Sequence, residues 1–242
     1  MTISERQRRL RAWIGEAERV VFLTGAGIST ESGIPDFRGP GGIYSDPEAA
    51  SVFEIEAFRR DPARFYRFAA RFLPLMEQSR PNRAHRAIAR LQDGRRVAVV
   101  TQNIDGLHRR AGSSALFCVH GDFDRLVCLG CGQQAETADY LVPIKQGEVP
   151  RHECGGTFKP TVTFFGEALP AGEWEGAARA IAAAQVLVIV GSSLTVYPAA
   201  TLPDYRPDDS RLVIINREPT PRDREADLLF REGAGDVLEM FL

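Results

Sequence analysis

The chain has 242 residues, of which 44% are hydrophobic and 26% are charged, as in an ordinary globular protein with a sizeable core. A formal net charge of −2 excludes a strongly basic surface, so we expect neither nucleic acid nor a membrane as a partner. The charged N-terminus lacks the apolar centre of a signal peptide, and the longest apolar stretch, residues 180–190, is too short to span a bilayer. Four cysteines with one Cys-x-x-Cys pair indicate metal ligation in a reducing cytoplasm.

The first predicted strand, residues 20–23, ends at Gly25-Ala-Gly27 and runs on into a predicted helix. Glycine lets a backbone approach a pyrophosphate, and free amides at a helix start face the anion. The usual dinucleotide fingerprint has a third glycine where this chain has Thr30. An aromatic and a cationic residue within 35–38 then predict a loop that folds over the dinucleotide, unlike a hydride-transfer enzyme.

Apolar runs typical of strands alternate with helical patterns along the rest of the chain. This alternation predicts an α/β fold, a Rossmann-like parallel sheet with helices on both faces. The predicted strands are 20–23, 97–100, 116–119, 186–190 and 212–215, and the helices include 7–17, 85–91 and 173–184.

Two stretches interrupt this alternation. Residues 40–75 predict aromatic-rich helices, and residues 121–163 hold three of the four cysteines among many turn residues. We expect both insertions to form one small lobe of a helical part and a zinc-ribbon part. The segments 1–39, 76–120 and 164–242 would then form the dinucleotide-binding domain, with a substrate cleft between the two.

Polar residues follow all five predicted strands at the sheet edge where ligands bind in open α/β folds. His120 ends the third run, and imidazole there predicts a general base because it changes charge near neutral pH. Asn103 and Asp105 offer groups for ribose hydroxyls or a carboxamide, although either could instead cap the following helix. The pair Ser192-Ser193 after Gly191 predicts a second phosphate contact or an ordinary strand–helix turn.

The cysteine cluster predicts a structural zinc ion. Cys128 and Cys131 form one knuckle of a zinc ribbon, and Cys154 belongs to the second, whose first position holds Arg151. His152 would complete a three-cysteine, one-histidine site if the turn shifts by one residue. The alternative is a metal-free lobe with free thiols, but so small and polar a lobe has little core to hold it together.

These motifs together resemble the sirtuin family of NAD-dependent protein-lysine deacylases. Residues 39–44 and 65–68 are similar to those of bacterial members. The resemblance rests on Gly25-Ala-Gly-Ile-Ser, Gly33-Ile-Pro-Asp-Phe-Arg-Gly39, Thr101-Gln-Asn-Ile-Asp-Gly-Leu-His108, His120-Gly121, the cysteine lobe, Phe164-Phe-Gly-Glu167 and Gly191-Ser-Ser-Leu-Thr-Val.

The resemblance implies that NAD is consumed as a substrate and that its ribose accepts the acyl group of a protein lysine. His120 would act as the base and Asn103 would position the ribose or a water. The NAD site would comprise Gly25, Ala26, Gly27, Thr30, Asp36, Phe37, Arg38, Gln102, Asn103, Ile104, Asp105, His120, Gly191, Ser192, Ser193, Asn216, Asp236 and Val237. The acyl-lysine segment would lie as an added strand between Phe164, Phe165, Gly166 and Glu167 on one side and Leu194, Thr195 and Val196 on the other.

One departure from the family pattern bears on the acyl group. Members that prefer succinyl or malonyl lysine have a Tyr-x-x-Arg pair, whereas here Tyr66 is followed three residues later by Ala69. We therefore expect a preference for uncharged acyl groups. A mono-ADP-ribosyltransferase using the same NAD site is the alternative enzyme, and an NAD or ADP-ribose sensor is the non-enzymatic alternative.

Overall fold

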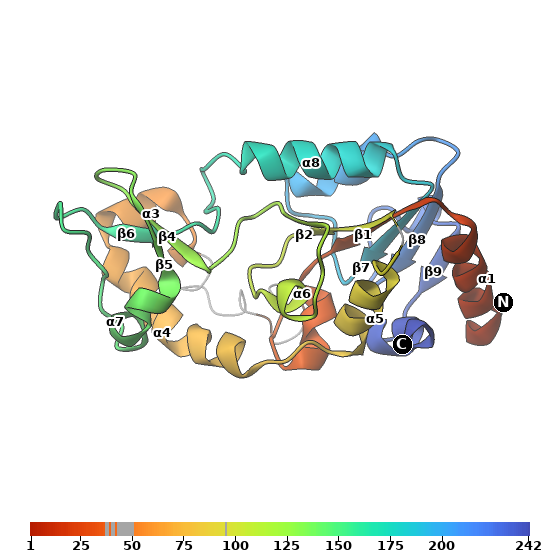
Figure 1. Ribbon diagram of the computed structural model, residues 1–242, viewed down its shortest axis with the longest axis horizontal. Coiled ribbons are helices and arrows are strands. Elements are labelled where there is room, and N and C mark those ends of the chain that lie inside the picture. Colours follow the sequence, from red (N-terminus) through yellow and green to blue (C-terminus); the bar gives the residue numbers. More distant parts are fainter. Residues whose placement is uncertain (37–38, 40–41, 43–50, 95) are drawn as a thin grey trace.

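The larger lobe of the protein is built on a six-stranded parallel sheet (Figure 1). The computed structural model describes residues 1–36, 39, 42, 51–94 and 96–242. The strand order is β3-β2-β1-β7-β8-β9, and each neighbouring pair is parallel. Taken in chain order this is the 3-2-1-4-5-6 arrangement of dinucleotide-binding folds, so the predicted Rossmann-like class is confirmed. The strands are β1 (Arg19–Thr24), β2 (Arg96–Thr101), β3 (Leu116–Cys118), β7 (Val186–Val190), β8 (Arg211–Ile215) and β9 (Leu228–Phe230).

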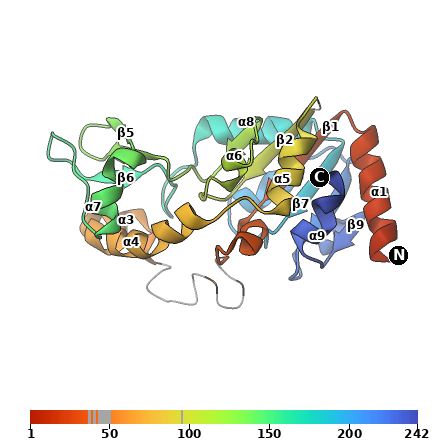
Figure 2. The ribbon, with the colours of Figure 1, turned by 60° about the horizontal axis from the view of Figure 1, so that its bottom comes forward.

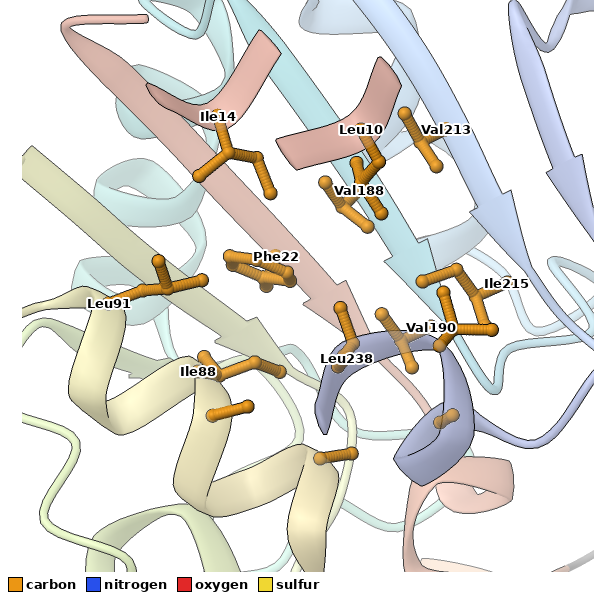
Figure 3. Close-up of a cluster of buried hydrophobic side chains, with 14 of the residues drawn as sticks. Leu10, Ile14, Phe22, Ile88, Leu91, Val188, Val190, Val213, Ile215 and Leu238 are labelled. Carbon is orange, nitrogen blue, oxygen red and sulfur yellow. The ribbon is translucent and has the colours of Figure 1, made fainter. Parts of the chain in front are cut away.

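Both faces of the sheet are buried, which explains why its strands are continuous apolar runs rather than alternating ones. On one face Phe22 packs with α1 (Ile3–Glu16), α5 (Arg83–Leu91) and α9 (Ala234–Leu238), and Figure 3 shows this cluster. On the other face Leu23, the next residue, packs with the residues of α8 (Ala171–Ala182). The predicted helices 7–17, 85–91 and 173–184 therefore correspond to α1, α5 and α8.

The second lobe lies at the other end of the long axis of the molecule, in both ribbon views (Figures 1 and 2). Its antiparallel sheet has the order β5-β4-β6 and is accompanied, in the described part of the chain, by three α-helices. Aromatic side chains from residues 53–72 form its core with Phe123, Phe158 and Phe164, as the sequence predicts. The elements are α3 (Ile55–Arg60), α4 (Pro62–Gln78), β4 (Arg125–Cys128), β5 (Gln134–Glu136), α7 (Leu141–Lys145) and β6 (Phe158–Pro160). The exact domain boundaries stay a prediction.

Two local features differ from the sequence-based expectation. Strand β9 was not predicted, because its apolar run covers only residues 228–230, whereas the run that predicted β3 covers 116–119. The helix after the first glycine loop, η1 (Ala26–Ser32), is a 3-10 helix. Among the described residues, no helix combines the length and apolarity needed to cross a bilayer.

Candidate active site

A cavity of about 750 Å³ opens at the carboxyl ends of the strands. It lies where the strand order reverses between β1 and β7, which is where ligands bind in doubly wound folds. Most of the predicted site residues line it, and their roles remain predictions. They are Gly25, Ala26, Gly27, Thr30, Asp36, Gln102, Asn103, Ile104, His120, Phe164, Phe165, Gly166, Glu167, Gly191, Ser192, Ser193, Val196 and Asn216.

Three glycines bring the ends of β1 and β7 into close contact. Gly191 has φ 61°, and a Cβ there would overlap the backbone of Gly27 and Ile28. The Gly25 amide donates to the Val190 carbonyl at 3.0 Å, and the Gly27 amide donates to the Gly191 carbonyl at 2.8 Å. These two amides are therefore engaged within the protein, and the phosphate contact of the loop stays a prediction.

His120 follows β3 and lines the cavity. Its Nδ1 lies 3.0 Å from the carbonyl oxygen of Gln102, which can only accept. Nδ1 therefore carries the proton and Nε2 keeps its lone pair, which is the state a general base needs. Burial lowers the pKa of His120 below its usual value, although the bond to Gln102 opposes the shift.

Asn103 is held from two sides. Its side-chain amide donates to the Gly25 carbonyl at 3.1 Å and to the Ser29 hydroxyl at 3.2 Å. Its backbone amide donates to the Thr101 hydroxyl, which also accepts a bond from Thr24 at 2.9 Å. The hydroxyls of Ser29 and Thr101 thus fix the side chain and the backbone of Asn103, and no sequence motif predicted this role for them.

Asp105 lies behind the cavity rather than among its lining residues. Its two carboxylate oxygens accept from the Ser29 hydroxyl at 2.6 Å and from the Leu107 amide at 2.8 Å. The second bond satisfies an amide at the start of α6 (Leu107–Arg110), which is the capping alternative for this residue. Burial raises the pKa of Asp105, against the hydrogen bonds from Ser29 and Leu107.

Both segments predicted to hold a peptide contribute to the cavity wall. The backbone of Phe165 pairs with residues 53–55 through bonds to Phe53 and Ile55, and its side chain is exposed. In the other segment, Val196 and the following Tyr197 line the cavity, whereas Leu194 and Thr195 do not. Leu194 is buried with φ 54°, in the left-handed region that a leucine rarely adopts.

One other predicted pair is placed differently. Val237 is buried in the core, and Asp236 accepts from Arg83 at 2.6 Å; neither lines the cavity. Phe37 and Arg38, predicted to cover the reactive centre and reach the phosphates, lie outside the described residues. Several further residues line the cavity although no sequence motif predicted them: Glu31, Phe53, Val162, Thr163, Tyr197, Arg217, Glu218, Glu232 and Ala234. Arg217 and Glu218 directly follow Asn216, and Glu232 and Ala234 follow the unpredicted β9. All four therefore lie just beyond the carboxyl end of a strand, and this position is the sequence signal for them.

The four residues predicted to hold zinc lie together. The ligand atoms of Cys128, Cys131, His152 and Cys154 are all within 4.8 Å of one another. Two sulfurs bound to one tetrahedral zinc at about 2.3 Å lie about 3.8 Å apart. The Cys128–Cys154 sulfur separation is 3.6 Å and the Cys131 sulfur lies 3.4 Å from His152 Nδ1, so the set fits one structural zinc with all four positions filled by protein.

Comparison with known proteins decides the family. The Sir2 family model matches residues 25–198. This chain belongs to the Sir2, or sirtuin, family. It is 40% identical to an NAD-dependent protein deacetylase of Sulfolobus acidocaldarius over 100% of this chain and 94% of that protein. It is 41% identical to a protein of the same description from Thermotoga maritima, over 93% and 92% of the two chains.

Solved sirtuin structures superpose on almost all of this sirtuin. A Sir2 complex with a p53 peptide and NAD⁺ is 37% identical and has a TM-score of 0.88, covering 99% of this chain and 97% of the other. Sir2Tm bound to a propionylated peptide is 36% identical with a TM-score of 0.87, covering 97% and 96%. The relatives are both archaeal and bacterial, so the likeness extends beyond the bacterial members.

Proposed function

We propose that this sirtuin removes acyl groups from protein lysines with NAD as the consumed co-substrate. The observation that carries the proposal is the position of His120, whose free Nε2 belongs to a cavity bounded by both glycine loops and by the 164–167 segment. One end of this cavity suits a dinucleotide and the other suits an extended peptide. The complexes of similar proteins with NAD⁺ and with acyl peptides support both assignments.

The residues of this chain supply binding, orientation and one proton transfer. The acyl oxygen attacks the anomeric carbon of the nicotinamide ribose, and nicotinamide leaves with the bonding electrons. His120 Nε2 takes the proton of a ribose hydroxyl, which then accepts the acyl carbon, while Asn103 holds the ribose or a water. Cleavage of the amide consumes one water and yields free lysine and O-acyl-ADP-ribose.

Replacing the base tests this mechanism. His120→Ala should lower kcat by about 10²–10⁴-fold, because a positioned general base contributes that much, while NAD still binds. Peptide-dependent nicotinamide release and calorimetric NAD binding measure the two effects. Arg179→Ala, at an exposed position on α8, is the control and should match the wild type. Wild-type turnover by the His120→Ala protein would overturn the assignment.

We expect the acyl group to be uncharged. Tyr66 is fully buried and donates to the Phe158 carbonyl at 2.8 Å, and Ala69 is also buried, so neither offers a cation to an acyl carboxylate. Arg67 pairs with Asp61 on the exposed side of α4. Acetyl and propionyl peptides should therefore be turned over at least about tenfold more efficiently than a succinyl peptide of the same sequence, measured as kcat/KM. Equal efficiencies would contradict this.

Two alternatives have less support. A mono-ADP-ribosyltransferase would use the same NAD site, but the similar proteins are named deacetylases and deacylases. A protein that only senses NAD or ADP-ribose needs no general base, so the hydrogen bond that leaves His120 Nε2 with its lone pair favours an enzyme. The cytoplasmic location stays a prediction, in keeping with four free cysteines, three of which belong to the metal-ligand set.

A further inference from the structure

Lys159 is one of only two lysines among 30 basic residues, and it is buried in the wall of the peptide end of the cavity. It lies on β6, the strand of the small lobe that leads into residues 162–167. Those six residues all line the cavity. The side chain of Lys159 is 3% exposed, whereas that of its ion-pair partner, Glu167, is 26% exposed. The buried cation therefore lies behind the wall and its anion reaches toward the cleft.

The ammonium group is saturated by oxygens of this one segment. Nζ donates to the carbonyls of Pro160 at 3.0 Å and Val162 at 2.7 Å, and it lies 2.9 Å from Glu167 Oε2. An ammonium has three N–H groups radiating from one atom, so the three oxygens use all of them. It also lies 4.1 Å from the centre of the Phe164 ring, within the range of a cation–π contact.

Glu167 passes this restraint to the backbone. The same oxygen that pairs with Lys159 accepts from the Phe164 amide at 2.7 Å, and the Glu167 amide donates to the Phe164 carbonyl at 3.0 Å. One nitrogen thus sets the path of the chain from Pro160 to Glu167. This is the segment on which the proposed acyl peptide would add as a strand, where main-chain geometry determines affinity.

We propose that Lys159 is a positioning residue for the acyl-peptide substrate: its ammonium shapes the 162–167 segment into the conformation that binds the peptide backbone. This inference rests on the proposed function, because it concerns the peptide half of the same site. It also explains why a lysine stands at this position in a chain with 28 arginines and two lysines. A planar guanidinium spreads its five N–H groups over three nitrogens and does not converge on three oxygens around one point.

The test compares Lys159→Met and Lys159→Arg with Lys145→Met. Lys145 is the other lysine; it is partly exposed on α7 and pairs with Glu77 at 2.8 Å, away from the cavity lining. The measurements are KM for the acyl peptide at saturating NAD, KM for NAD at saturating peptide, and zinc content as a check of the folded lobe. Both Lys159 variants should raise KM for the peptide by about tenfold or more and leave KM for NAD within about twofold. Lys145→Met should match the wild type.

The two proposals fail in different ways. No peptide-dependent turnover by the wild-type protein would remove the proposed function. An active wild type with an unchanged peptide KM in both Lys159 variants, or with the two KM values rising together, would overturn only the positioning role. If Lys159→Met does not fold, Glu167→Gln tests the positioning role of Lys159 instead. This variant keeps an oxygen for the Phe164 amide and removes the charge that faces Lys159. A raised peptide KM in that variant supports the inference, and an unchanged one overturns it.

Discussion

One hydrogen bond makes the two ring nitrogens of His120 chemically different. Nδ1 donates to Gln102, so the proton is held there and Nε2 keeps its lone pair, as the proposed general base requires. The adjacent Asn103 is fixed in a similar way by Gly25 and Ser29. At this scale the site is a set of side chains whose protonation and direction are set before substrate arrives.

The burial of His120 should be visible in the pH dependence of kcat/KM. Burial lowers the pKa of His120 below 6.5, so the neutral base persists as pH falls through 6.5 and is lost only below that. The acid limb of kcat/KM should therefore lie below pH 6.5, measured with an acetyl peptide between about pH 5 and about pH 8.5. Circular dichroism at each pH controls for unfolding. An acid limb centred above pH 6.5 would assign the titration to another group.

The second knuckle of the small lobe is a short turn that carries two of the four predicted zinc ligands. Around the second knuckle, Arg151 forms a bridge with Thr157, and the turn that follows begins at His152 and contains Cys154. Gly156 must lack a side chain, because a Cβ there would lie 2.5 Å from the Cys128 sulfur. The lobe thus offers a histidine one position after the missing cysteine at 151, and the metal-ligand role of His152 stays a prediction.

Adjacent substitutions test this ligand assignment. His152→Ala should reduce zinc from about one ion per chain to near zero after dialysis against a weak chelator, because three ligands hold zinc less firmly than four. Arg151→Ala is the matched control and should keep its zinc, because its side chain is exposed and lies outside the ligand set. Metal analysis of both proteins gives the answer. Equal zinc contents would show that His152 is not a ligand.

Among the residues that the structure describes, the buried side chains form three clusters, two on the faces of the large sheet and one in the small lobe. The cavity lies where wall residues from both lobes meet, with Gly25 and Gly191 from one and Phe53 and Val162 from the other. A change in the small lobe therefore alters one wall of the site without disrupting the large sheet.

Removal of zinc should make this independence measurable. A strong chelator should increase amide hydrogen exchange in β4, β5 and β6 by about tenfold or more and leave β1 and β7 protected, because the large sheet has its own core on both faces. Hydrogen exchange with peptide-level mass spectrometry, with re-added zinc as the control, distinguishes the regions. Loss of protection in both lobes together would contradict two separately stabilised units.

The sequence by itself determined the fold class, five of the six strands of the large sheet and most of the cavity lining. These follow from local patterns: a short apolar run between turn residues predicts a strand that is buried on both faces, and the residue after it lies at the ligand edge. Only the tertiary structure decided which of those residues face the cavity. It turned Asp105 toward Ser29, committed the amides of Gly25 and Gly27 to β7, and brought Lys159 to Glu167. The reason is that hydrogen-bond partners far apart along the chain meet only when the fold closes, and no local pattern records which of them will satisfy one another.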